Sequence, residues 1–177
     1  HVVSSVKFAK KAEEAGVDAV VAEGFEAGGH NGRDETTTLC LIPMVAEEIT
    51  IPLIAAGGIG TGRGMLAAMN LGADGVQIGS LFALSEESSA HTNFKNLAIH
   101  SEEGDTKLLL KSLHPVRLLK STFSQAVEKA ESQTRAAAEA VVKAEEAKVA
   151  AAEVKAAAVE VKPVVTKSGT KLTLDLP

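Results

Sequence analysis

The sequence predicts an α/β fold in which short strands alternate with helices, followed by a long Ala-rich helix and a short β-hairpin. Unbroken apolar runs such as 53–56 are typical of parallel strands that are covered on both faces. Glycines follow these runs, and apolar residues then recur at helical spacing. After residue 123 the composition changes to Ala, Glu, Lys and Val, which favours a long helix.

The chain begins in what reads as the end of a strand. Apolar residues at helical spacing then predict a helix over 6–15, with Ser4 or Ser5 as its N-cap and Gly16 as its stop. Residues 17–22 predict a buried strand. One strand–helix unit therefore ends, and another begins, within this part of the chain.

Residues 23–36 predict a loop, because they are too rich in glycine and charge for a regular element. Residues 37–49 predict a helix, with Pro43 near its first turn or at a kink. Cys40 is interpreted as a small buried residue rather than a reactive thiol. The residues of this helix expected to face inward are Leu39, Leu41, Ile42, Val45 and Ala46.

The stretch 52–82 contains two consecutive strands that each end in a glycine turn. Leu53–Ala56 is followed by Gly57 and Gly58, a helix over 64–71 ends at Gly72, and a buried strand over 75–78 precedes Gly79 and Ser80. Backbone N–H groups from two such neighbouring turns converge, which favours a phosphate site. The alternative is a pair of ordinary tight turns.

Five motifs carry a family resemblance, and they occur in the family's order and spacing. They are 22–24 (AEG), 26–30 (EAGGH), 55–59 (AAGGI), 62–64 (GRG) and 72–80 (GADGVQIGS). Together they resemble the nitronate monooxygenase family, formerly called 2-nitropropane dioxygenases, which are FMN enzymes on a TIM barrel. Flavin-dependent enoyl-acyl-carrier-protein reductases share nearly the same signatures. The resemblance covers about residues 2–123 and implies the C-terminal half of a (β/α)8 TIM barrel.

The resemblance also implies the site. His30 matches the family's active-site histidine, and an imidazole that titrates near neutrality suits a general base. The pattern alone also allows a solvated loop histidine. Glu23 lies where some monooxygenases have glutamine, and the Ala-Glu-Gly form is also typical of the reductase branch. The cofactor is expected to be FMN, and the residues expected to bind it are Glu23, Gly28, Gly29, Gly57, Gly58, Gln77, Ile78, Gly79 and Ser80.

Three functions remain open at this point. The first is oxidation of nitronates with O2 to a carbonyl compound and nitrite. The second is reduction of an enoyl thioester with NAD(P)H through the flavin. The third is a non-catalytic fragment whose helical tail, 124–162, binds a partner or a second copy of the chain.

Length and charge restrict the alternatives. The chain has 177 residues, fewer than the roughly 250 of a full barrel, so we expect a fragment with an open sheet edge. A net charge of −5 argues against a nucleic-acid partner. A single cysteine, with no run of about 20 apolar residues and no signal-peptide pattern, favours the cytoplasm. A small-molecule substrate is expected, without a metal site or a membrane contact.

The expected organisation has three parts. Residues 1–123 form the partial barrel that binds FMN, 124–162 an Ala/Glu/Lys-rich helix, and 163–177 a hairpin or frayed tail. Pairs spaced four apart, Glu131–Arg135 and Glu139–Lys143, favour a solvated helix, and the weak heptad pattern leaves self-association as the alternative. The histidines at 91, 100 and 114 are interpreted as exposed or locally hydrogen-bonded.

Overall fold

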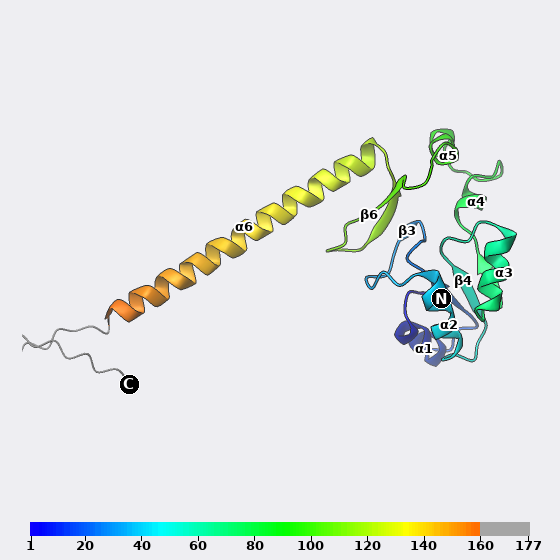
Figure 1. Ribbon diagram of the computed structural model, residues 1–177, viewed down its shortest axis with the longest axis horizontal. Helices are drawn as coiled ribbons and strands as arrows, with labels where there is room; N and C mark the ends of the chain where they lie inside the picture. Colours follow the sequence, from blue (N-terminus) through cyan, green and yellow to red (C-terminus); the bar gives the residue numbers. More distant parts are fainter. Residues whose placement is uncertain (160–177) are drawn as a thin grey trace, which may run out of the picture. The chain divides into compact units, whose positions relative to one another are not determined.

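The computed structural model describes residues 1–159, with side chains described through residue 152 (Figure 1). It divides into two compact units, His1–Glu131 and Ser132–Pro177. The last helix, α6 (Thr122–Val159), contributes to both. The predicted hairpin at 163–177 lies outside the described residues, and the expected domain boundaries stay a prediction.

A four-stranded parallel sheet forms the centre of the first unit. Its strands follow the order β1-β2-β4-β5, and each is joined to the next by a helix. The strands are β1 (Val2–Val3), β2 (Val20–Glu23), β4 (Leu53–Ala56) and β5 (Gly75–Gln77). The connecting helices are α1 (Val6–Glu14), α2 (Thr38–Ala46) and α3 (Gly62–Asn70). These alternating units confirm the α/β fold.

The core lies between one face of this sheet and the helices. Val20 of β2 and Leu53 of β4 belong to the same hydrophobic cluster as Ile42 and Val45 of α2, and all four side chains are buried. On the opposite face Val2, Val21 and Ile54 lie side by side across β1, β2 and β4. Val2 is 50% exposed, and the other two are only half-buried. The sheet is therefore packed on one face, although parallel sheets are usually covered on both.

The incomplete cover corrects one expectation. The strand at 75–78 was expected to be buried, but β5 is an edge strand in which Val76 is half-buried and Gln77 is exposed. An edge strand has a neighbour on one side only, so its side chains lose half of the usual lateral contacts.

Two expectations about α2 were also wrong. Leu41, Ile42 and Val45 face the core as expected, but Leu39 is 68% exposed and Cys40 is exposed. The reason is the position of the first helical turn. Thr38 is hydrogen-bonded to the carbonyl of Gly57, just beyond the end of β4, so this turn extends past the packed part of the sheet.

The caps of α1 agree with the sequence. The Ser5 hydroxyl accepts a hydrogen bond from the Phe8 amide at 3.4 Å, as an N-cap does. Gly16 has a φ of +82°, the left-handed conformation that favours glycine after a helix. Short local patterns therefore predicted this helix closely.

A second, antiparallel sheet follows the order β3-β7-β6. It consists of β3 (Gly29–His30), β6 (Thr106–Leu109) and β7 (Val116–Leu119). The short helices α4 (Ser80–Ala83) and α5 (Thr92–Ile99) precede the last two strands. The segment 23–36 was expected to contain no regular element, so β3 is a correction. Its pairing partner, β7, lies far along the chain, and the local pattern does not reveal such pairing.

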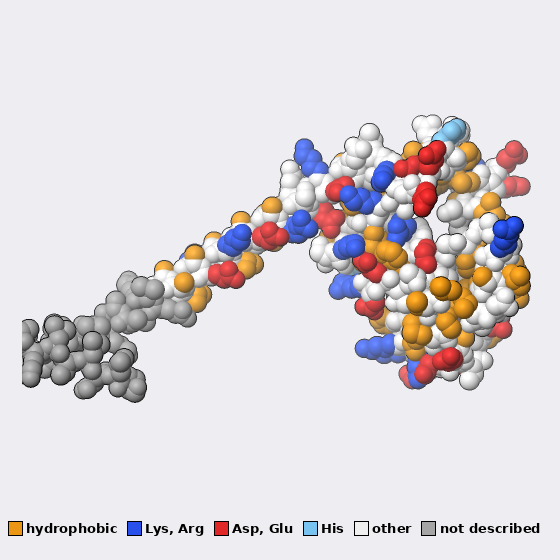
Figure 2. All heavy atoms as spheres, in the orientation of Figure 1, with side chains coloured by type: hydrophobic (Ala, Val, Ile, Leu, Met, Phe, Trp, Pro, Cys, Tyr) orange, Lys and Arg blue, Asp and Glu red, His pale blue; other side chains and the backbone are white. Residues whose placement is uncertain are grey.

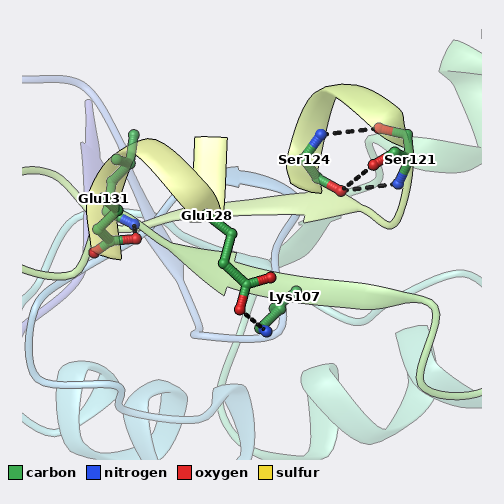
Figure 3. A network of polar contacts seen from close by, with 6 residues as sticks. Lys107, Ser121, Ser124, Glu128 and Glu131 are labelled. Carbon is green, nitrogen blue, oxygen red and sulfur yellow. Dashed lines mark hydrogen bonds and ion pairs between the residues drawn. The ribbon is translucent and has the colours of Figure 1, made fainter. Parts of the chain in front are cut away.

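The first turns of α6 are fixed to this second sheet (Figure 3). Ser121 and Ser124 cap each other, with the amide of each donating to the hydroxyl of the other at 2.8 and 3.2 Å. Lys107 of β6 forms an ion pair with Glu128. The Leu110 amide donates to Glu131 at 2.8 Å. The helix begins at Thr122, close to the expected Ser124.

The described part of α6 beyond residue 131 carries acidic and basic side chains along its length (Figure 2). Arg135 lies 3.7 Å from Glu139, whereas we expected it to pair with Glu131. Val141, Val142 and Val149 are each more than half exposed. Within the described range no helix is both long and apolar enough to cross a bilayer. Whether the helix is only solvated or binds a partner stays a prediction.

Candidate functional site

The carboxyl ends of three neighbouring strands form one edge of the parallel sheet. Glu23 of β2 is in register with Ala56 of β4, and Ala56 with Gln77 of β5. The Gly24 amide donates to the Ala56 carbonyl at 2.9 Å, which extends the pairing by one residue. This edge, which we call the strand-end edge, therefore brings together the residues that follow β2, β4 and β5. Ligand sites in parallel α/β folds lie at such edges.

Gly57 and Gly58 turn the chain away from β4 at this edge. Both have positive φ, +103° and +67°, which side chains rarely adopt. A Cβ on Gly57 would lie 2.8 Å from the Gly24 carbonyl oxygen and 2.8 Å from the Thr38 hydroxyl. Gly57 is therefore required by packing between the turns after β2 and β4, whatever the ligand.

Gly79 has a different environment. A Cβ built on it would meet no atom within 4 Å, and its φ of −91° suits any residue. Among the described residues, the amides of Gly58, Ile59 and Gly79 have no hydrogen-bond acceptor. At Gly79 the unpaired amide lies beside open space, which fits a phosphate group, since a phosphate accepts several N–H bonds. The strand-end edge therefore presents unpaired amide donors of the kind that bind phosphate.

Glu23 is the half-buried acid of this edge. Burial raises the pKa of its carboxyl above the usual range. The side chain lies beside Ala56, which is buried, while Gln77 at the end of the same row is exposed. Along this edge the side chains are therefore covered near β2 and exposed near β5.

The loop after β2 carries His30. The Phe25 amide donates to the Thr36 carbonyl at 2.8 Å, which closes the loop at its base. The Asn31 side-chain amide donates to the carbonyls of Ala27 and Gly29, at 2.9 and 3.0 Å, which folds the tip. Gly29 has a φ of +87°, and His30 is exposed. An exposed imidazole on a folded loop is accessible to a substrate.

Glu26 connects this loop to the strand-end edge. A Cβ on Gly58 would lie 3.1 Å from the Glu26 Cβ, so the two residues are in contact. The Glu26 carboxylate also accepts the Thr38 amide at 2.9 Å, at the start of α2. The structure therefore brings the candidates into two connected groups. Those on the strand-end edge are Glu23, Gly57, Gly58, Gln77, Ile78, Gly79 and Ser80, and those on the loop are Gly28, Gly29 and His30.

Thr38 was not singled out from the sequence. Its hydroxyl lies 2.8 Å from the Gly57 carbonyl oxygen, 2.9 Å from Glu26 Oε2 and 3.3 Å from the Ala56 carbonyl oxygen. One hydroxyl proton serves one of these acceptors at a time. Through these contacts Thr38 links the loop after β2, the start of α2 and the end of β4. The threonine run that precedes an apolar helix could have indicated a capping role.

Comparison with known proteins identifies the family. The nitronate monooxygenase family model matches residues 1–173. The chain belongs to this family. The match extends past residue 123, where the resemblance was expected to end. A probable nitronate monooxygenase from Staphylococcus haemolyticus is 48% identical over 103 residues, which is 53% of this chain and 29% of that protein.

Solved structures agree with this assignment. FabK from Thermotoga maritima superposes with a TM-score of 0.71 at 43% identity, over 78% of this chain and 44% of that one. A nitroalkane oxidase from Streptomyces ansochromogenes gives a TM-score of 0.65 at 31% identity, over 73% and 40%. The chain thus spans less than half the length of these relatives. The partial TIM-barrel fold is confirmed, since the chain matches part of TIM-barrel enzymes.

The family consists of oxidoreductases that use a flavin cofactor. This agrees with the unpaired amides at the strand-end edge. Among residues 1–159 no group of three His, Cys, Asp or Glu side chains is placed to hold a metal ion. The roles of the individual site residues stay predictions.

Proposed function

We propose that this chain provides the phosphate-binding part and the catalytic base of an FMN-dependent nitronate monooxygenase. Such an enzyme oxidises a nitronate with O2 to a carbonyl compound and nitrite. When bound, FMN supplies the redox chemistry by accepting electrons from the substrate and passing them to O2. The observation that carries the proposal is the set of unpaired amides at Gly58, Ile59 and Gly79, in a chain of this family.

Each group of residues has a distinct task. The amides of Gly58 and Gly79 donate to the flavin phosphate, and the Ser80 hydroxyl is a further donor. Gln77 and Glu23 lie on the same edge, where they bind the groups next to the phosphate. Gly28 and Gly29 let the loop approach the cofactor closely. The His30 imidazole accepts the α-proton when the substrate is a neutral nitroalkane.

The phosphate contact is tested by adding one methyl group. Gly79→Ala places a Cβ in the open space that the phosphate would occupy, without backbone strain. FMN affinity of the chain, measured by flavin fluorescence, should fall by about tenfold, equivalent to about 1.4 kcal/mol. Riboflavin, which lacks the phosphate, should bind both proteins equally.

Gly75→Ala is the matched control, because Gly75 also has open space around its Cβ position but lies at the opposite end of β5. It should leave FMN affinity unchanged. Equal losses in the two variants, or an equal loss for riboflavin, would contradict a phosphate site at Gly79. We expect the chain by itself to bind FMN weakly, since it spans less than half of its structural relatives.

The role of His30 is tested with two substrates. A neutral nitroalkane must lose its α-proton, whereas a nitronate has already lost it. In a complete barrel that contains this chain, His30→Ala should therefore lower turnover of the neutral nitroalkane by about 100-fold or more and that of the nitronate much less. A similar loss with both substrates would exclude the base role.

The second candidate is a flavin-dependent enoyl-thioester reductase that uses NAD(P)H. It is favoured by Glu23, in the Ala-Glu-Gly form typical of the reductase branch, and by the match to FabK. Nitronate turnover without nicotinamide favours the monooxygenase. Enoyl-thioester reduction that requires NAD(P)H, without nitronate turnover, favours the reductase.

A further inference from the structure

We propose that Arg117 is a positioning residue that holds the His30 loop in its folded arrangement. The proposal rests on the proposed function for the role of His30, but the contacts that carry it are independent of that role. Arg117 lies in β7, far from the loop in sequence and outside the motifs at the strand-end edge. The sequence indicated no task for it.

The guanidinium of Arg117 binds the base of the loop. Its Nη2 and Nε donate to the Phe25 carbonyl oxygen at 3.0 and 3.3 Å. The guanidinium carbon also lies 4.5 Å from the centre of the Phe25 ring. A hydrogen bond from a charged donor is stronger than a neutral one, and stacking of a cation on a ring adds to it. Phe25 is therefore fixed through both its backbone and its side chain.

The backbone around Arg117 pairs with the tip of the same loop. In the pairing of β3 with β7, Arg117 is opposite Gly29 and Val116 is opposite His30. The backbone amide of Asn31 then donates to the Pro115 carbonyl at 2.8 Å. Residues 115–117, at the start of β7, thus contact the loop both before and after His30. The loop is closed across β7 rather than by its own residues alone.

Arginine has properties here that lysine lacks. A planar guanidinium donates from several nitrogens while it stacks on an aromatic ring, whereas an ammonium group is a point charge. Arg117 uses a third nitrogen, Nη1, which lies 3.3 Å from the Thr106 hydroxyl of β6. It therefore links the loop to both other strands of the antiparallel sheet. Arg117→Lys should keep the charge but lose this arrangement.

Amide hydrogen exchange of the chain tests the positioning without any cofactor. Arg117→Met should increase exchange of the Asn31 amide and of peptides covering 25–31 by about tenfold or more, and Arg117→Lys should restore little of the protection. Phe25→Leu keeps the carbonyl but removes the ring, so it should give a smaller increase. Peptides from β2 and β4 should be unchanged in all three variants.

Arg135→Met is the matched control, because Arg135 is an exposed arginine on α6 that pairs with Glu139. It should not alter exchange at 25–31. Unchanged exchange in Arg117→Met, or full protection in Arg117→Lys, would overturn the proposal. If Arg117→Met also unfolds β2 and β4, the milder Phe25→Leu variant decides, and no local effect there would overturn it.

A kinetic comparison separates positioning from general loss of structure. In a complete, flavin-loaded barrel that contains this chain, Arg117→Met should lower turnover of a neutral nitroalkane about tenfold or more while changing nitronate turnover little, since only the former needs His30 in place. Equal loss with both substrates would overturn positioning of the base. If His30→Ala itself shows no difference between the substrates, the proposed function fails, while the exchange result still reports on the loop.

Discussion

The two sheets of the first unit are held together by different forces. The parallel sheet packs on a continuous apolar core that includes Val20, Ile42, Val45 and Leu53, each at most 2% exposed. In the antiparallel sheet, Leu109 is the buried apolar side chain among the described strand residues. The other apolar side chains of its strands are half-buried, and polar contacts add to them, including those of Arg117 with Phe25 and of Asn31 with the loop carbonyls.

This difference determines where each part of the site is rigid. The strand-end edge is built directly on the parallel sheet, and its Gly58 amide follows β4, whose Leu53 and Ala55 lie in the core. The His30 loop is held by hydrogen bonds at the surface, which open more readily than a packed core. In the proposed function, cofactor binding belongs to the stable region and proton transfer to the loop that opens more readily. Substitutions in the two regions should therefore differ in how much they change stability and in how far along the chain the change extends.

The largest effect is expected in the core. Ile42→Ala removes a fully buried side chain beneath β2 and β4 and should lower the free energy of unfolding by about 2–5 kcal/mol. The chain has no Trp or Tyr, so unfolding in urea is best followed by hydrogen exchange in peptides of β2 and β4. Leu39→Ala, on the same helix but 68% exposed, is the control and should change stability little. Equal losses would mean that α2 packs through its other face.

A smaller effect is expected at the junction between core and site. Gly57→Ala combines a positive φ with a Cβ only 2.8 Å from the Gly24 carbonyl oxygen, so it should cost about 1–3 kcal/mol. The loss should appear in the global unfolding curve, because the turn directly follows β4. Gly60→Ala has open space and no positive φ, and it should be nearly neutral. If Gly57→Ala leaves the free energy of unfolding unchanged, the turn does not contribute to the stability of the core.

A local effect is expected in the loop. Asn31→Ala removes the two hydrogen bonds to the carbonyls of Ala27 and Gly29, which destabilises the loop. It also removes Oδ1, a buried acceptor without a partner, which partly offsets that loss. The net cost should be about 1 kcal/mol. Exchange of peptides covering 25–31 should increase, while urea unfolding of β2 and β4 should not shift. A shift in both would show that the antiparallel sheet unfolds together with the core and would remove the distinction drawn above.

The same distinction explains what could be predicted from the sequence. The helix α1, the strands of the parallel sheet and the turn at Gly57 depend on apolar spacing and glycine positions within a few residues, and they were predicted. The strand β3 was missed because its stability comes from pairing with β7, not from its own residues. Leu39 and Cys40 were expected to be buried because helical spacing alone does not show where the sheet ends.

The site divides in the same way. The family motifs indicated His30 and the glycines, since these residues are contiguous in sequence. They did not indicate Thr38 or Arg117, whose contacts with Gly57 and Phe25 depend on the fold. Residues that bind through backbone atoms of distant segments leave little pattern in the sequence around them.

The smallest effect expected concerns pH. Burial raises the folded-state pKa of Glu23, so its ionised form destabilises the folded chain. The penalty is absent below the unfolded pKa, near 4.3, and grows as the pH rises through the folded pKa. Glu23→Gln should therefore be more stable than the original chain at pH 7, by roughly a few tenths of a kcal/mol because the group is half exposed. The difference should vanish near pH 4.

Glu13 is the control, because its pKa is shifted in the opposite direction. The Thr50 hydroxyl and amide, both 2.7 Å from its carboxylate, lower its pKa. Its stabilisation is therefore present above the unfolded pKa and lost as the pH falls through the folded one. Glu13→Gln should be less stable than the original chain at pH 7 and approach it in acid. Urea unfolding of both variants between pH 3 and 7 measures the two slopes, and slopes of the same sign would exclude a desolvated Glu23 at the strand-end edge.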